Sequence, residues 1–198
     1  RPETESWNGS AWSEVNDLNT GRYVPAGFGI STTAICAGGT DDSSDLAITE
    51  SWNGTSWTEV NNLNTARRYI RGSGPSTDGL VAGGSAGGSV ANVESWNGTS
   101  WTETTDINSA RSATGAVGSS SSNSLIYGGQ SPASALTEAW NGTAWTEVAD
   151  LAAARLEPGS SGANNTSAIC ATGGTPTRTA VTEEWSADAY QIKTVTTS

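Results

Sequence analysis

The sequence predicts an all-β fold, a β-propeller built of four-stranded blades. Three observations lead to it: one motif recurs about every 45 residues, each copy carries an Asn-Gly turn between paired aromatic residues, and no stretch shows the spacing of an amphipathic helix. A unit of this length, divided into short strands, fits a radial propeller in which repetition of blades protects the sheet edges.

The repeat is marked by its tryptophans. The first of each unit recurs at steps of 45, 44, 44 and 45 residues: Trp7, Trp52, Trp96, Trp140 and Trp185. A second aromatic residue follows five positions later: Trp12, Trp57, Trp101, Trp145 and Tyr190. These positions hold all 9 tryptophans of the chain, so the placement of this residue is entirely periodic.

Between the paired aromatics lies an Asn-Gly dipeptide in four of the five copies, beginning at Asn8, Asn53, Asn97 and Asn141. Asn-Gly tolerates a positive φ at both central positions of a two-residue turn, and this turn suits the twist of a β-hairpin. We therefore expect a tight hairpin in each unit, with residues on both sides of the turn in strands.

The other half of the unit is apolar and ends in a double glycine, as in residues 34–39, 79–84 and 124–129. The pairs Gly38-Gly39, Gly83-Gly84, Gly128-Gly129 and Gly173-Gly174 recur at steps of 45 residues. Short apolar runs that end in glycine are typical of buried strands that neighbours approach closely. A strand of small residues precedes each run, which completes four strands for each unit.

These residues resemble the Kelch repeat, in which a hydrophobic strand ends in Gly-Gly and aromatic residues follow on the outer strands. The resemblance covers nearly the whole chain, although the outer-strand aromatic is Trp rather than Tyr and the aromatic pair is closer together. The sequence Glu-Ser-Trp-Asn-Gly-Thr-Ser-Trp-Thr-Glu-Val also resembles repeat arrays in structural proteins of marine phages, notably cyanophages. That resemblance implies a virion protein.

We expect a single domain over residues 1–198. Its units are a half unit at 3–15 and four complete units at 21–60, 66–104, 111–148 and 155–197. A ring needs a whole number of blades, so four and a half blades predict that something completes it. Upstream residues with further blades, or another chain, are the two alternatives, and the start at Arg1 within a repeat favours a processed portion of a longer protein.

Glutamates and arginines also follow the repeat. A glutamate lies two residues before each first aromatic: Glu5, Glu50, Glu94, Glu138 and Glu183. An arginine follows the outer strand at matching points of four units: Arg22, Arg67, Arg111 and Arg155. Two carboxylates flank the sugar in glycoside hydrolases. However, a catalytic residue occurs once, whereas these recur in every unit, so we predict structural Arg-Glu pairs between blades or to backbone carbonyls.

Other repeated or clustered polar residues have simpler explanations. Asp17, Asn62, Asp106 and Asp150 precede the arginines, where we expect Asx side chains to bond the backbone two residues on in the crossover between blades. The Asn-Gly-Ser and Asn-Gly-Thr triplets are also glycosylation sequons, but the hairpin explains them. The loop with Asp41, Asp42 and Asp45 matches no calcium-binding spacing, so we interpret it as solvated.

Composition narrows the function. Asp and Glu outnumber Lys and Arg by 20 to 9, so no basic footprint for nucleic acid or anionic membrane exists. The chain has no histidine, which excludes His-based triads, most zinc sites and a galactose-oxidase-like copper site. We expect that the chain is not an enzyme and that it binds neither a cofactor nor a metal.

Cys36 and Cys170 lie in similar sequence contexts in two different units. This favours two buried free thiols over a disulfide.

The segments after the second strands differ between units, and variable loops on a rigid scaffold are where recognition is usually built. We place the binding residues there: Asp41, Asp42, Asp45, Ser85, Gln130, Ser131, Thr175 and Arg178. The first hypothesis is a non-catalytic virion module, in a tail, fibre or capsid decoration, that binds other virion proteins or a host-surface glycan or protein. The alternatives are a sialidase-like, glycan-active propeller enzyme and an intracellular Kelch adaptor. Outside a virion, we expect a secreted or cell-surface location.

Overall fold

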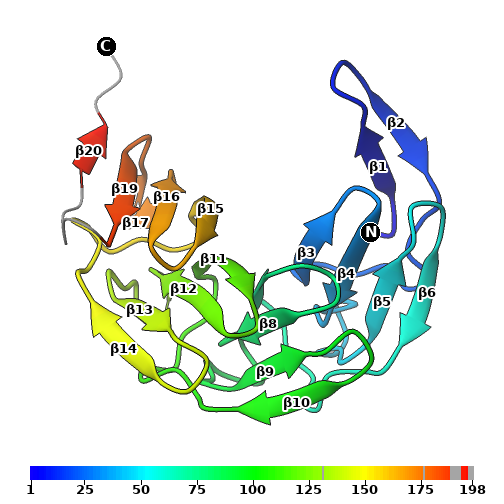
Figure 1. Ribbon diagram of the computed structural model, residues 1–198, viewed down its shortest axis with the longest axis horizontal. Coiled ribbons are helices and arrows are strands. Elements are labelled where there is room, and N and C mark those ends of the chain that lie inside the picture. Colours follow the sequence, from blue (N-terminus) through cyan, green and yellow to red (C-terminus); the bar gives the residue numbers. More distant parts are fainter. Residues whose placement is uncertain (131, 176, 188–192, 196–198) are drawn as a thin grey trace.

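The computed structural model describes residues 1–130, 132–175, 177–187 and 193–195 (Figure 1). Over these residues the fold is all-β and contains no helix. Four antiparallel four-stranded sheets are arranged as the blades of a propeller, and a two-stranded hairpin precedes them (Figure 1). The predicted fold class is confirmed. Within the described residues, no helix is long and apolar enough to cross a membrane.

Each blade is a meander of consecutive strands. The N-terminal hairpin is β1 (Thr4–Trp7) and β2 (Trp12–Val15). Blade 1 is β3 (Ala26–Ile30), β4 (Thr33–Ala37), β5 (Thr49–Trp52) and β6 (Trp57–Val60), and blade 2 is β7 (Arg71–Ser73), β8 (Gly79–Ala82), β9 (Val93–Trp96) and β10 (Trp101–Thr104). Blade 3 is β11 (Gly115–Ser120), β12 (Asn123–Tyr127), β13 (Thr137–Trp140) and β14 (Trp145–Val148). Blade 4 is β15 (Gly159–Asn164), β16 (Ser167–Ala171), β19 (Thr182–Ser186) and β20 (Lys193–Val195), with the short pair β17 (Gly174–Thr175) and β18 (Thr177–Arg178) in its β16–β19 connection.

The first strands of the blades lie innermost. β3 contacts β7, β7 contacts β11, and β11 contacts β15, so the four strands follow one another around the axis. The ring is open, because β15 and β3 lie on opposite sides of a gap between blade 4 and the N-terminal hairpin (Figure 1). The molecule is therefore an arc of four complete blades with half a blade at its N-terminal end.

The Asn-Gly segments form hairpins, but their turn differs from the one predicted. Trp52 lies opposite Trp57 in the ladder, so residues 53–56 form a four-residue loop. Only Gly54 has a positive φ, of 92°, while the Asn53 side chain accepts the backbone N–H groups of Thr55 and Ser56 at 2.9 Å. The two-residue turn was wrong because the Asx side chain caps a longer loop and leaves asparagine in an ordinary conformation.

The hydrophobic core lies between blades rather than within them. One cluster joins blades 1 and 2 through Phe28, Ile35, Val81 and Trp101, among others. Equivalent clusters join blade 2 to blade 3 and blade 3 to blade 4. Each blade is thus stabilised mainly by burial of apolar side chains against its neighbour.

The double glycine is needed because a neighbouring backbone comes close. A Cβ at Gly38, Gly83 or Gly128 would lie 2.4–2.7 Å from the carbonyl oxygen of the arginine that begins the next blade. That same carbonyl accepts the N–H of the second glycine, as from Gly84 to Arg111 at 2.9 Å. The first glycines also have φ near +65°, a region that favours glycine.

The last unit departs from this pattern by one residue. Thr172, not Gly173, directly follows β16 and has the φ of the first glycine, +62°. Its carbonyl accepts from Arg155 as that of Gly83 accepts from Arg67. The equivalent pair in blade 4 is therefore Thr172-Gly173.

The two cysteines are free and buried, as predicted. Burial is the main cause that raises the pKa of each thiol to about 11. Because the thiolate is the reactive form, both side chains act as small apolar groups of the core.

Candidate binding face

The scaffold of the candidate face is a repeated Arg-Glu pair. Each arginine enters the next blade and meets the glutamate of its third strand: Arg22 with Glu50, Arg67 with Glu94, Arg111 with Glu138 and Arg155 with Glu183. Every one of these side chains is at most 2% exposed. The pairs lie within single blades, so the prediction of bridges between blades was wrong, whereas the predicted bonds to backbone carbonyls are present. Because they are buried, these carboxylates and guanidinium groups are not available to a ligand.

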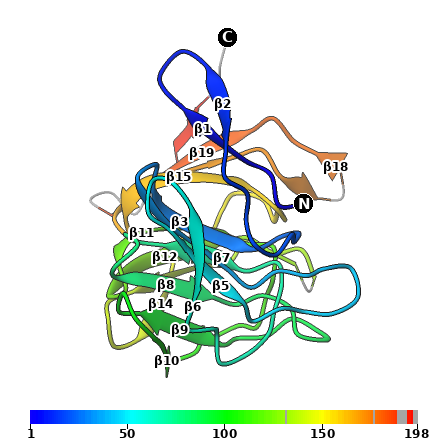
Figure 2. The same cartoon turned by 90° about the vertical axis from the view of Figure 1, so that its right-hand side faces the viewer.

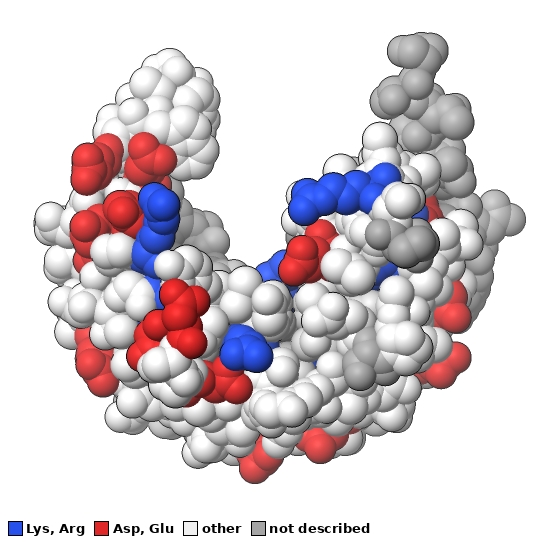
Figure 3. Space-filling view, turned by 180° about the vertical axis from the view of Figure 1, so that it is seen from behind, with Lys and Arg blue, Asp and Glu red and all other residues white. Residues whose placement is uncertain are grey.

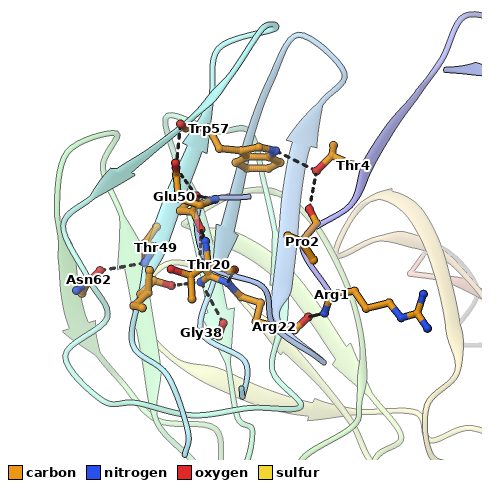
Figure 4. Close-up of polar contacts among 12 residues, drawn as sticks. Arg1, Pro2, Thr4, Thr20, Arg22, Gly38, Thr49, Glu50, Trp57 and Asn62 are labelled. Atoms are coloured by element: carbon orange, nitrogen blue, oxygen red, sulfur yellow. Dashed lines mark hydrogen bonds and ion pairs between the residues drawn. The ribbon is translucent and has the colours of Figure 1, made fainter. Parts of the chain in front are cut away.

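The arginine also holds the backbone of its blade. The guanidinium of Arg67 donates to the carbonyls of Gly83 and Asn92 at 2.7 and 2.6 Å and lies 2.9 Å from Glu94. Burial lowers the pKa of the Arg67 guanidinium, and the charge of Glu94 opposes that shift. Figure 4 shows the equivalent network in blade 1, where Arg22 contacts Glu50 and Gly38.

The glutamate in turn fixes the connection between blades. One oxygen of Glu94 accepts the backbone N–H and the side-chain amide of Asn64, both at 2.8 Å. Asn19 and Asn108 bond Glu50 and Glu138 in the same way, whereas Ala152 supplies only its backbone N–H to Glu183. A carboxylate that accepts several bonds in a buried position orients the connection strongly.

The Asx residues act differently from the prediction. Asn62 and Asp150 accept the backbone N–H of Thr49 and Thr137, and Asp17 accepts that of Thr4 (Figure 4 shows the Asn62 bond). Each of these side chains accepts the N–H of a residue 13 positions earlier in the chain, at the start of the third strand. The predicted partner was the residue two positions later. The prediction was wrong because the antiparallel hairpin brings its own beginning next to the Asx residue.

Directly after each arginine comes a variable dipeptide that the sequence analysis passed over. The four dipeptides are Tyr23-Val24, Arg68-Tyr69, Ser112-Ala113 and Leu156-Glu157. Their second residues all have a positive φ of 48–53°, although none is glycine. Non-glycine residues in this region are strained and persist only when the surroundings impose the conformation.

Backbone hydrogen bonds between neighbouring blades impose it here. The N–H of Tyr69 donates to Val24 at 3.0 Å, that of Ala113 to Tyr69 at 3.0 Å, and that of Glu157 to Ala113 at 2.8 Å. The dipeptides therefore form one continuous line across the four blades. Their side chains differ while their backbones are equivalent, which is the pattern of a recognition surface on a fixed scaffold.

Each dipeptide also pairs with the first residue of the loop after the second strand. Tyr23 exchanges two backbone bonds with Thr40, and Arg68 does the same with Ser85. Ser112 pairs with Gln130, and Leu156 pairs with Gly174. We call the four dipeptides together with loops 40–47, 85–91, 130–135 and 174–180 the binding face.

In blade 1 the predicted acidic residues of this face have separate roles. Asp41 caps its own turn by accepting the Ser43 hydroxyl at 2.7 Å and the backbone N–H groups of Ser43 and Ser44 at 2.9 Å. The bond from the Ser43 hydroxyl, followed by the two backbone bonds, lowers the pKa of its carboxyl group to about 2. Asp42 is exposed. Asp45 lies 3.3 Å from the guanidinium of Arg68, which is 41% exposed. Across the described residues, no group of three acidic or cysteine side chains is placed to hold a metal ion.

Aromatic and basic side chains lie beside these acids. Tyr23 is 44% exposed, and the guanidinium of Arg68 lies 5.9 Å from the ring centroid of Tyr69. Figure 2 shows β18 projecting on this side of the blades, and Figure 3 looks onto the same side, where Lys and Arg atoms lie around the central hollow with acidic atoms near them. The face is therefore mixed in charge even though the chain carries a net charge of −11.

In blade 4 the face carries a cavity. Its volume is about 480 Å³, and Leu156, Glu157, Thr172, Arg178 and Thr179 are among the residues that line it. Gly174, rather than the predicted Thr175, occupies the position of Thr40, Ser85 and Gln130. Ser131 and the side chain of Thr175 lie outside the described residues.

Sequence reasoning found the variable loops but missed the dipeptides. Two variable residues between a repeated arginine and a repeated small-residue strand give no periodic signal. Their variation among units at one fixed distance from the arginine was the signal that could have identified them.

Compared with known proteins, the chain matches no protein-family model, and no curated protein matches it.

Proposed function

We propose that the chain is a non-catalytic binding module, a Kelch-type propeller that acts within a virion as part of a tail, fibre or capsid decoration. Its ligand is another virion protein or a host-surface glycan or protein, bound through the binding face. The resemblance of the repeat sequence to structural proteins of marine phages supports the proposed location in a virion. The observation that carries the proposal is the line of variable dipeptides and loops on an otherwise identical backbone.

The chemistry of the face fits recognition better than catalysis. Exposed Tyr23 offers a flat ring with a hydroxyl group, and Arg68 offers several donors beside the carboxylate of Asp45. Tyrosine and polar residues of this kind supply adaptable contacts in other recognition loops. Four of the five repeated carboxylates that would serve a hydrolase are buried in ion pairs, so no chemical step is assigned to them.

A microarray of bacterial and algal surface polysaccharides tests the proposal. We expect the intact chain to bind selected glycans and to release no reducing ends from them. Tyr23→Ala and Arg68→Ala should each weaken that binding at least tenfold. Thr99→Ala, in an exposed hairpin turn between β9 and β10, is the matched control and should leave it unchanged. Binding that survives both changes on the face, or hydrolysis of a bound glycan, would overturn the proposal.

A further inference from the structure

The N-terminal hairpin exposes Trp7 and Glu5, whose counterparts every complete blade buries. Trp7 and Trp12 are 47% and 64% exposed, whereas Trp52 and Trp96, which match Trp7, are 6% and 1% exposed. Glu5 is also exposed, whereas its counterparts lie in buried ion pairs. No arginine reaches Glu5 within the described part of the chain.

The hairpin nevertheless sits where the outer half of a blade belongs. The indole N–H of Trp57 donates to the Thr4 hydroxyl at 3.2 Å (Figure 4). The indole N–H of Trp101 donates in the same way to the Thr49 hydroxyl at 3.1 Å. The N–H of Leu18 donates to the carbonyl of Pro2 at 3.0 Å. Leu63 makes the same bond to Ala47 at 3.0 Å. The free edge of β1 is therefore held in the position at which β5, β9 and β13 receive a second strand.

A groove marks the missing half of the interface. A hollow of about 460 Å³ lies between the hairpin and blade 1. A second hollow of about 450 Å³, lined by residues of blade 1, adjoins it and shares Ile30, Ser31, Ala34 and Trp57 in its wall. Ile30 is 66% exposed. Each interface between complete blades instead contains a packed cluster of apolar side chains.

The filled interface next to it shows what this groove accepts. In blade 2, Phe28 of the preceding blade covers Gly72 and Gly79, where a Cβ would lie 2.5 and 2.2 Å from its ring. The same ring meets Trp101 edge-on at 6.2 Å. Gly27 matches Gly72, and the space around its Cβ position is open to 4 Å. The groove therefore has room for an aromatic side chain.

We propose that the edge of β1 and the adjoining groove form a strand-addition site for an inner β-hairpin of this repeat type. Strand addition of this kind draws affinity from main-chain bonds and specificity from alternate side chains. The occupant needs an arginine for Glu5, an aromatic residue for the groove, and a turn carbonyl for the indole N–H of Trp7. In blade 1, Arg22, Phe28 and the Ser31 carbonyl supply these three groups.

The probe is a labelled synthetic peptide with the sequence of residues 19–40 and Cys36→Ala, titrated into the full chain. We expect saturable binding and reduced acrylamide quenching of tryptophan fluorescence, since Trp7 and Trp12 are the exposed indoles of the described residues. Phe28→Ala or Arg22→Ala in the peptide should weaken binding at least tenfold. Glu5→Gln in the protein should do the same, and Glu14→Gln, on the exposed neighbouring strand, is the matched control.

A fusion of the same hairpin to the chain tests the site even if the free peptide does not fold. Residues 19–45 placed directly before Arg1 would complete the half blade formed by β1 and β2, because the carbonyl of Arg1 accepts the N–H of Arg22 as the carbonyl of Leu46 accepts that of Arg67. This fusion should raise the unfolding midpoint and lower tryptophan quenching. Absence of both effects overturns the proposal, as does peptide binding that Glu5→Gln leaves unchanged. A stable dimer of the chain alone that Glu5→Gln abolishes would assign the edge to a second copy and also overturn it.

Discussion

Replacing Arg67 by alanine tests whether the buried Arg-Glu pairs stabilise the blades. Arg67 is fully buried, and its loss leaves the carboxylate of Glu94 and the carbonyls of Gly83 and Asn92 without their donor. Removal of one partner from a buried ion pair costs about 3–5 kcal/mol. In a chain of this size each kcal/mol lowers the unfolding midpoint by about 2–4 °C, so Arg67→Ala should lower it by roughly 6–20 °C.

The adjacent residue provides the control. Arg68 also faces a carboxylate, Asp45 at 3.3 Å, but its side chain is 41% exposed. Exposed pairs contribute about 0–1 kcal/mol, so Arg68→Ala should lower the midpoint by at most about 4 °C. Differential scanning calorimetry of both variants gives the comparison. Equal midpoints for the two variants would show that burial of the pair is not what stabilises the blade.

Two substitutions test the double-glycine positions, and one labelling experiment tests the cysteines. Gly83→Ala should destabilise the protein by about 2–5 kcal/mol in urea unfolding, because its Cβ would lie 2.4 Å from the Arg111 carbonyl at a φ of +64°. Thr172→Gly, at the matching position of blade 4, should instead stabilise by about 1 kcal/mol, since it relieves the strain at φ +62° and a more flexible unfolded chain offsets part of the gain. A stability loss in Thr172→Gly would contradict the assigned equivalence. Cys36 and Cys170, with thiol pKa values of about 11, should react with a disulfide reagent at pH 8 about 100-fold more slowly than ordinary thiols of pKa 9.0, and denaturant should remove the difference. Rapid labelling of the folded chain would contradict the burial.

The periodic residues made the fold predictable. Tryptophan pairs, turn glycines and double glycines each have one structural role, and repetition makes that role visible in a single sequence. The pairing of Arg67 with Glu94 also follows from repetition, because residues that recur together in every unit occupy equivalent places. What failed were local details such as the turn at Asn53, where a four-residue loop and a two-residue turn use the same dipeptide.

The binding face was less predictable for a physical reason. Tyr23 and Arg68 occupy equivalent backbone positions, but nothing local in the sequence indicates that their backbones pair with the loops that begin at Thr40 and Ser85. That pairing arises when the connection from one blade reaches the second strand of the next. Such contacts are properties of the assembled ring, whereas the hairpins are encoded within a few residues.

The departure at Thr172 bears on how the arc can be extended. In blades 1 to 3, glycine at this position allows the arginine carbonyl of the next blade to lie within 2.4–2.7 Å of a Cβ position. Thr172 has a real Cβ there, so a further blade docked on blade 4 in the same way would clash with it. The opposite end has no such obstacle, because the space beside Gly27 is open. Addition of an inner β-hairpin is therefore sterically favoured at the N-terminal hairpin, where Glu5, Trp7 and the groove beside Trp57 present the surfaces that each complete blade uses.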